Sequence, residues 1–256
     1  MILFDEIIFG PVMSRRLGVS LGINLLPENK KYCNFNCIYC ECGLSYNTSV
    51  TGSKLPSAEN VKQKLLEKLS QMKEEGQKLN AITFAGNGEP TIHPEFSGII
   101  DNTIEARNAY YPEALVSVLS NATMLANENI FNALQKTDRN ILKLDSAVES
   151  TFLKINRPAS SVNIYKIIDN LKKFNGDFYL QTMFLKGIID GEKIDNTTDE
   201  EIAAWLNILQ VVRPKHVQIY SIHRTPPYAS IEIISKQELE KIAEKVRNLG
   251  IEVLTV

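Results

Sequence analysis

Cysteine is almost absent from this chain of 256 residues. Only four are present, Cys33, Cys37, Cys40 and Cys42, and they lie within ten residues of one another. A disulfide framework spreads its cysteines to tie distant segments together, so this cluster is typical of metal binding instead. The sequence also lacks a run of roughly 18 apolar residues, which argues against an integral membrane protein. The basic start of a secretory signal is missing too, so we expect a cytoplasmic protein.

An excess of charge of one sign is also missing. Lys plus Arg number 28 and Asp plus Glu number 30, which gives a net charge of −2. This balance provides no general attraction to phosphates, so a nucleic-acid partner is not favoured, and we expect no membrane partner. Apolar residues make up 44% of the chain and charged residues 23%, which is ordinary for a folded globular protein.

Short apolar segments alternate with amphipathic ones along the chain. The pattern predicts strands at 19–25, 81–85, 115–119, 141–144, 178–185, 217–221 and 251–255, and helices at 57–75, 94–108, 127–135, 162–174, 198–212 and 235–248. This alternation implies parallel strands with helical crossovers. No Gly-rich dinucleotide-binding turn follows the first strand, and the units are too few for a full eight-fold barrel. We therefore predict one α/β domain over residues 1–256, a partial, open (β/α)6 TIM-like barrel of parallel strands.

The spacing Cys33-x3-Cys37-x2-Cys40 favours an iron–sulfur cluster. Cysteine thiolates hold such clusters, normally four of them, so three ligands on a four-iron cluster leave one iron open. The alternative is a structural zinc site that uses all four cysteines, which would make the chain a structural or interaction module. Zinc ribbons usually pair two distant Cys-x2-Cys knuckles, and this chain has no second pair. The role of Cys42 is left open.

Two motifs carry a resemblance to a known family. Residues 33–40, CNFNCIYC, resemble the Cys-x3-Cys-x-aromatic-Cys signature of the radical S-adenosylmethionine (SAM) superfamily. Residues 84–90, FAGNGEP, follow the second predicted strand and are similar to the Gly-Gly-Glu motif of that family. Shorter segments resemble a branch related to the wyosine-forming tRNA enzymes; they lie at 9–12, 14–18, 120–123, 143–145 and 155–158.

The resemblance implies a radical SAM enzyme with an unassigned substrate. In that family the open iron of a 4Fe-4S cluster binds SAM. One electron from the reduced cluster then cleaves SAM to methionine and a 5′-deoxyadenosyl radical, which takes a hydrogen atom from the substrate. The resemblance also implies a low-potential electron donor, flavodoxin or ferredoxin. The cofactor supplies the reactivity, while the protein positions it and excludes other reactions.

The resemblance also implies roles for individual residues. Cys33, Cys37 and Cys40 would bind the cluster, and Tyr39 would lie near the adenine of SAM. The other residues expected to contact SAM are Gly86, Asn87, Gly88, Glu89, Asn121, Lys143 and Asp145. The glycines allow close backbone approach, and Glu89 can accept hydrogen bonds from an ammonium group. The alternatives are an ordinary turn at 86–89 and helix capping by Asn121 and Asp145.

Features outside these motifs are weaker candidates. Gln181 and Tyr220 lie on predicted strands, and packing in the core explains them about equally well. Residues 186–196 form a polar, Gly-containing segment that we interpret as a loop able to act as a lid. Arg15 and Arg16 precede the first predicted strand, and the sequence does not fix their location.

Within the superfamily, RNA modification and glycyl-radical activation of a partner enzyme both stay open. We do not expect wyosine formation, because the wyosine-forming enzymes look as if they need a second cluster in addition to the first. The extra cysteines that such a cluster needs are absent here.

Overall fold

The computed structural model describes residues 2–44 and 55–256. The strands are β1 (Ile8–Ser14), β2 (Gly18–Ile23), β3 (Ala81–Phe84), β4 (Leu115–Ser120), β5 (Arg139–Lys143), β6 (Tyr179–Met183), β7 (Leu185–Ile189), β8 (Glu192–Asp195), β9 (His216–Tyr220), β10 (Ile231–Ile233) and β11 (Glu252–Thr255). The helices are α1 (Ala58–Glu74), α2 (Phe96–Tyr110), α3 (Glu128–Gln135), α4 (Glu149–Asn156), α5 (Ile164–Lys172), α6 (Asp199–Val212) and α7 (Lys236–Arg247), with a short 3₁₀ turn, η1 (Pro90–Ile92).

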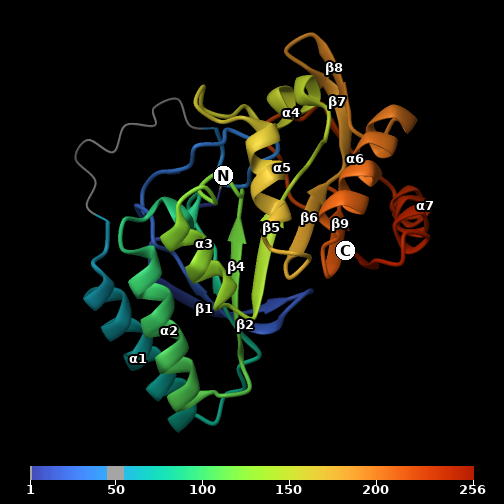
Figure 1. Ribbon diagram of the computed structural model, residues 1–256. Helices are drawn as coiled ribbons and strands as arrows, with labels where there is room; N and C mark the ends of the chain where they lie inside the picture. The colour runs from blue at the N-terminus through green and yellow to red at the C-terminus, as the bar shows by residue number, and fades with distance from the viewer. Residues whose placement is uncertain (1, 45–54) are drawn as a thin grey trace.

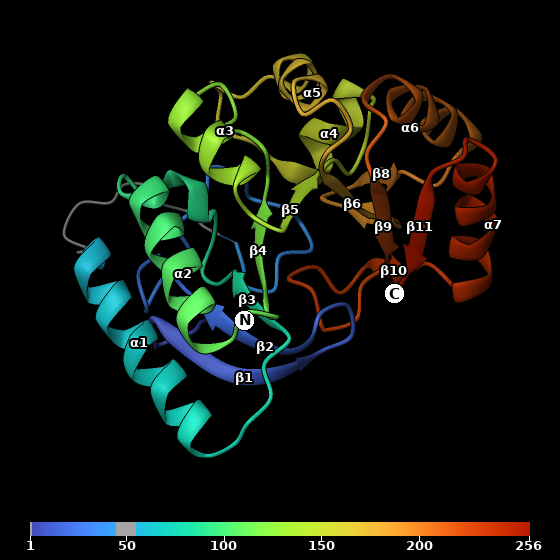
Figure 2. The ribbon, with the colours of Figure 1, turned by 60° about the horizontal axis from the view of Figure 1, so that its bottom comes forward.

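The main sheet follows the order β1-β2-β3-β4-β5-β6-β9-β11. From β2 onward each neighbouring pair is parallel, and only β1 runs antiparallel to its partner. The sheet curves, and the helices lie along its outer side, from α1 at one end to α7 at the other (Figures 1 and 2). The prediction of a partial barrel of parallel strands is confirmed.

The helices form because each presents an apolar stripe to the sheet and begins at a capping side chain. In α1, Val61, Leu65 and Leu69 are buried against the core, and the Ser57 side chain accepts a hydrogen bond from the Asn60 amide. In α7, Ser235 and Glu238 form a reciprocal capping box. These local signals are those that the sequence displays, which is why the predicted and observed helices agree closely.

The inner side of the curved sheet carries alternate residues of each strand. The register places Leu119 of β4 beside Ile141 of β5, and Lys143 beside Gln181 of β6. Because side chains on one face recur every second residue, Leu119 and Ile141 form one layer and Lys143 and Gln181 form the next, nearer the carboxyl ends of the strands. Ligands of parallel α/β folds bind at those ends.

The segment 186–196 is not a loop, so that part of the prediction was wrong. It forms the antiparallel pair β7 and β8, which with β10 makes a second, three-stranded sheet. Asp190 and Gly191 occupy the turn with φ of 51° and 83°. Positive φ at both central residues is what a tight two-residue hairpin requires, and Asp-Gly supplies it readily.

Strand β1 and helix α4 were also not predicted.

In the described parts of the chain, no helix is both long enough and apolar enough to cross a membrane.

Candidate functional site

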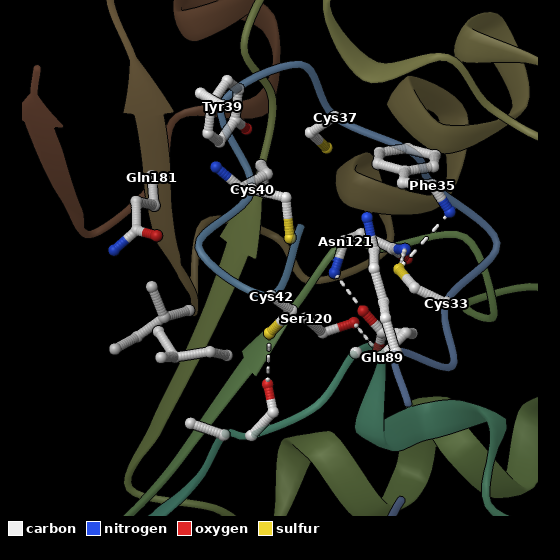
Figure 3. A pocket seen from close by; sticks show the side chains of 17 residues that line it. Cys33, Phe35, Cys37, Tyr39, Cys40, Cys42, Glu89, Ser120, Asn121 and Gln181 are labelled. Atoms are coloured by element: carbon white, nitrogen blue, oxygen red, sulfur yellow. Dashed lines mark hydrogen bonds between the residues drawn. The ribbon is translucent and has the colours of Figure 1, made fainter. Parts of the chain in front are cut away.

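A cavity of about 260 Å³ lies at the carboxyl ends of β3 to β6. The cysteine segment forms one wall, and residues at the ends of the strands form the other (Figure 3). Most of the residues predicted for cofactor binding line it: Cys33, Cys37, Tyr39, Cys40, Gly86, Gly88, Glu89, Asn121 and Lys143, together with Cys42. The two sequence motifs, about fifty residues apart in the chain, therefore face the same space.

Backbone hydrogen bonds hold the cysteine segment against the second motif. The Tyr32 amide donates to the Asn87 carbonyl at 2.7 Å, and the Glu89 amide donates to the Tyr32 carbonyl at 3.1 Å. Gly88 lies between these contacts with φ of 148°, and a Cβ atom there would be 1.8 Å from the Tyr32 carbonyl oxygen. Only glycine permits this approach, so Gly88 fixes the distance between the two walls.

Each thiol of the motif has its own electrostatic surroundings. Burial raises the pKa of Cys33 and raises that of Cys37 to about 11. For Cys40 the polar interaction with the neighbouring Cys42 outweighs burial and lowers the pKa to about 6. Buried thiolates need compensating positive charge, which metal ions supply when they bind cysteine.

Side-chain and backbone donors surround two of these sulfurs. The Phe35 amide donates to the Cys33 sulfur at 3.3 Å, and the Asn121 side chain approaches that sulfur at 3.6 Å. The Asn156 amide donates to the Cys37 sulfur at 3.4 Å. Hydrogen bonds of this kind stabilise thiolate ligands of iron–sulfur clusters and tune their potentials. Three thiols on one cavity, of which Cys37 is buried and Cys33 and Cys40 are partly buried, therefore fit an iron–sulfur cluster.

Glu89 forms the floor of the cavity next to the cysteines and is 2% exposed. Its carboxylate accepts hydrogen bonds from the Ser120 hydroxyl at 2.9 Å and the Asn121 amide at 2.6 Å, and from Thr91. Burial nevertheless raises the pKa of this carboxyl above its ordinary value. The result is a rigid acceptor held at the cavity wall (Figure 3).

The structure places Asn87 differently from the prediction. Its side chain does not line the cavity and instead points toward the N-terminal segment. Its amide donates to the carbonyls of Phe4 and Pro27, both at 2.8 Å, and its side-chain oxygen accepts from the Phe4 amide at 2.8 Å. Those bonds occupy the polar atoms of the Asn87 side chain, which therefore holds the N-terminal segment rather than facing the expected SAM site.

Asp145 also lies behind the cavity wall rather than in it. It is 1% exposed, and its carboxylate accepts hydrogen bonds from Tyr39, from Asn156 at 2.7 Å and from the Met183 amide at 2.9 Å. Lys143 pairs with it at 3.3 Å. Asp145 therefore orients two lining residues, Tyr39 and Lys143, and is a positioning residue.

Lys143 is held between three groups. It donates to the Tyr220 hydroxyl at 3.0 Å as well as to Asp145, and its ammonium lies 4.9 Å from the centre of the Tyr39 ring. Burial alone would lower the pKa of Lys143, but Asp145 and Tyr220 outweigh it and raise the pKa above its ordinary value. The side chain therefore stays a fixed cation at the cavity, and its link to Tyr220 extends the polar wall to β9.

Lys31 is a lining residue that the sequence did not indicate. It is only 6% exposed and donates to the Gly43 carbonyl at 3.2 Å, and its charge helps to lower the pKa of Cys40. In the sequence it ends the polar run Glu28-Asn29-Lys30-Lys31, which has the composition of an ordinary surface segment. Its position two residues before the first cysteine is the only signal that could have singled it out.

Comparison with known proteins decides the family. Residues 31–200, about two thirds of the chain, match the sequence profile described as the radical SAM superfamily. The chain belongs to the radical SAM superfamily. Membership implies an iron–sulfur cluster and SAM as cofactors, and the match includes both cavity-forming motifs.

Curated relatives with similar sequences span a range of lengths. The chain is 29% identical over 91% of its length to a protein named GTPase Obg from Brachyspira hyodysenteriae, but spans only 32% of that protein. It is 28% identical over 90% of its length to a UPF0026 protein from Methanocaldococcus jannaschii, of which it spans 69%.

Radical SAM structures share the fold. A radical SAM methyltransferase from Sphaerobacter thermophilus superposes with a TM-score of 0.67 at 14% identity, covering 93% of this chain and 65% of that one. Streptococcus suis SuiB bound to S-adenosylmethionine gives 0.63 at 15% identity, with coverage of 89% and 48%. TYW1 with a lysine-pyruvate adduct bound gives 0.63 at 14% identity, with coverage of 90% and 73%. These identities show the fold alone.

Proposed function

We propose that the protein binds a 4Fe-4S cluster through Cys33, Cys37 and Cys40 and cleaves SAM reductively, acting on an unidentified substrate. The observation that carries this proposal is the shared cavity: three thiols of one segment face the Gly86–Glu89 turn across it. Held by these thiols, a reduced 4Fe-4S cluster would supply the one electron needed to cleave SAM to methionine and a 5′-deoxyadenosyl radical.

The chain itself provides three things to this chemistry. Its thiols hold the metal while one cluster corner stays free for SAM. The turn at Gly86 and Gly88 provides backbone without side chains, where the methionine end of SAM can approach closely. Glu89 and Asn121 provide a fixed polar wall beside the thiols, and Tyr39 and Lys143 form the opposite one.

Partners and location follow from this reaction. A low-potential reductant of the flavodoxin or ferredoxin type is needed to reduce the cluster, and such donors are found in the cytoplasm, where we propose that this protein works. The donor needs access to the cluster edge, and Cys33, Cys40 and Cys42 are partly exposed whereas Cys37 is buried.

The zinc alternative has less support. A structural zinc site requires four ligands that converge on one ion. The thiols instead surround a cavity, and Cys42 donates a hydrogen bond to the Gly86 carbonyl at 3.3 Å.

Among radical SAM reactions, RNA modification and glycyl-radical activation remain alternatives. Wyosine formation is not proposed, because Cys42 is the one cysteine outside the motif. One thiol cannot replace the three that a second cluster needs.

Anaerobic reconstitution tests the proposal. The wild-type protein, reduced with dithionite in the presence of SAM, should release 5′-deoxyadenosine and methionine, as measured by liquid chromatography. Cys37→Ala should lose the cluster and this product, whereas the matched variant Cys42→Ser should keep the iron and sulfide content of the wild type. A colourless wild-type protein that carries zinc and releases no 5′-deoxyadenosine would contradict the proposal.

A further inference from the structure

A second cavity of about 110 Å³ adjoins the cofactor cavity. It lies between the β1–β2 hairpin and the inner side of β3 to β5. Three side chains, Ala85, Leu119 and Ile141, line both cavities. The register places Leu119 beside Ile141, so these residues form one layer across neighbouring strands. The two cavities therefore share this layer as part of their walls.

Arg16 is the charged residue that lines the second cavity. It lies in the turn between β1 and β2, and its guanidinium carbon is 5.5 Å from the centre of the Tyr220 ring. Its Nη1 atom is buried and has no hydrogen-bond partner among the described residues, within which Arg16 also forms no ion pair. A buried cationic donor without an acceptor is costly, so this nitrogen indicates a missing anionic or polar occupant.

The charges around Arg16 favour an anion. Arg139 donates to the Arg16 carbonyl at 3.5 Å, and its guanidinium carbon lies 5.5 Å from the centre of the Tyr179 ring. Within the parts that the structure describes, Arg139 also forms no ion pair. Lys143 adds a third cation, which Asp145 balances. Two of these three cations, Arg16 and Arg139, therefore lack a carboxylate partner among the described residues.

A neutral group in the same region is also unsatisfied. The hydroxyl of Ser117 is buried and lacks a partner in the described chain. Ser117 lies on the same face of β4 as Leu119, next to Arg139 in the register. The Ser20 and Thr83 hydroxyls, by contrast, bond to each other at 2.7 Å. Arg16 Nη1 and the Ser117 hydroxyl are therefore two unsatisfied polar groups in this part of the barrel.

We propose that Arg16 forms an anion subsite for the substrate, binding a carboxylate or phosphate group. This inference rests on the proposed function, since it assigns the substrate of the same reaction to an anionic class. Tyr220 connects the subsite to the cofactor: its ring contacts Arg16 and its hydroxyl accepts from Lys143, which lines the cofactor cavity. A substrate held at Arg16 would extend past the Leu119–Ile141 layer toward the SAM site.

Anion-dependent thermal stability tests the subsite without knowledge of the substrate. The cluster-loaded protein is heated with increasing inorganic phosphate in one arm and acetate in the other, at ionic strength held constant with potassium chloride. A ligand at about ten times its Kd raises the Tm of a chain of this size by about 3 °C. We expect that rise for at least one anion in the wild type, and the arm that responds identifies the class.

Variants assign the response to Arg16. Arg16→Gln should remove the rise in Tm, and Arg16→Lys should retain part of it, since lysine keeps the charge but not the two-pronged geometry. Arg15→Gln is the matched control, because Arg15 is the exposed neighbour in the same turn and its loss changes the net charge equally. Circular dichroism checks that each variant is folded. If Arg16→Gln is not folded, the rise in Tm is compared between Arg16→Lys and Arg15→Gln, and a smaller rise in Arg16→Lys assigns the response to Arg16.

Equal responses of wild type and Arg16 variants, or no response to either anion, would overturn the subsite. Neither outcome affects 5′-deoxyadenosine release, which tests the proposed function alone. Conversely, an Arg16-dependent anion response in a protein that never cleaves SAM would contradict the proposed function and leave an anion site of another purpose.

Discussion

The side-chain amide of Asn156 donates a hydrogen bond to the sulfur of Cys37 at 3.4 Å. Asn156 lies at the end of α4, and its other bond goes to Asp145. One asparagine thus connects a proposed cluster ligand to the carboxylate that orients Tyr39 and Lys143. Hydrogen bonds therefore connect the cysteine segment at Cys37 with the cavity side formed by Tyr39 and Lys143.

Removal of this donor should lower the potential of the cluster. An N–H···S bond is stronger when the cluster carries the extra electron, so its loss in Asn156→Ala disfavours reduction. A difference of about 0.7 kcal/mol between the two oxidation states corresponds to about 30 mV. Redox titration monitored by electron paramagnetic resonance measures the shift. Asn140→Ala, which removes a buried asparagine of β5 that bonds to the Asp177 carbonyl, should leave the potential unchanged; an equal or higher potential in Asn156→Ala refutes the assignment.

Gly88 should tolerate no side chain. In Gly88→Ala the new Cβ meets the Tyr32 carbonyl, and the positive φ is strained for alanine, so we expect a loss of about 3 kcal/mol or more in unfolding free energy together with poor cluster loading. Gly98→Ala is the control, since its Cβ would meet nothing within 4 Å in helix α2 and should stabilise by about 0.5–1 kcal/mol. Urea unfolding and iron content distinguish the two. Normal loading in Gly88→Ala would show that the close approach is not needed.

Asn87 should be structural rather than a SAM ligand. Asn87→Ala removes hydrogen bonds to the Phe4 and Pro27 backbone, which should cost about 2–4 kcal/mol of unfolding free energy. The affinity of the cluster-loaded variant for SAM, measured by calorimetry below its unfolding transition, should stay within about twofold of the wild type. A tenfold weaker affinity at unchanged stability is the result that restores the sequence-based expectation.

His93 should make stability depend on pH. Burial lowers its pKa below the ordinary value of 6.5, against the opposing effects of the Pro56 carbonyl and Glu95. The neutral ring bonds Pro56 through Nε2 at 2.9 Å and accepts from the Glu95 amide through Nδ1 at 3.1 Å. Since the folded pKa is the lower one, this stability is present above about pH 6.5 and is lost as the pH falls toward the folded pKa.

Urea midpoints at pH 7.5 and 5.5 test this sign. The wild type should lose more stability on acidification than His93→Gln, which cannot take up the proton. A variant that loses as much as the wild type would show that other groups cause the dependence.

The features that could be predicted from the sequence are those that depend on residues close together in the chain. Caps such as Ser57 and Ser235 and the apolar stripes of the helices gave their positions, because these signals act within a few residues. The cysteine spacing and the Gly86–Glu89 motif indicated where the site lies, because both motifs follow strands whose carboxyl ends lie at the same cavity. The Asp190-Gly191 turn was available as a hairpin signal, but the polar flanks favoured a loop.

The remaining features depend on contacts between distant segments. Asn87 stands where a SAM contact was expected, and only the return of the N-terminal segment to Phe4 shows why it points away. Lys31 belongs to a polar run and becomes buried only when the cysteine segment folds over the sheet. Arg16 could not be placed, because β1 was not predicted and the hairpin that carries it was therefore unknown.

The most direct test of the central claim is the electron paramagnetic resonance spectrum of the reduced, anaerobically prepared protein with and without SAM. If three thiolates leave one iron open, the wild type should show the signal of a reduced 4Fe-4S cluster, and SAM should change that signal. A protein that contains no such cluster, or whose cluster signal is identical with and without SAM, would contradict the account.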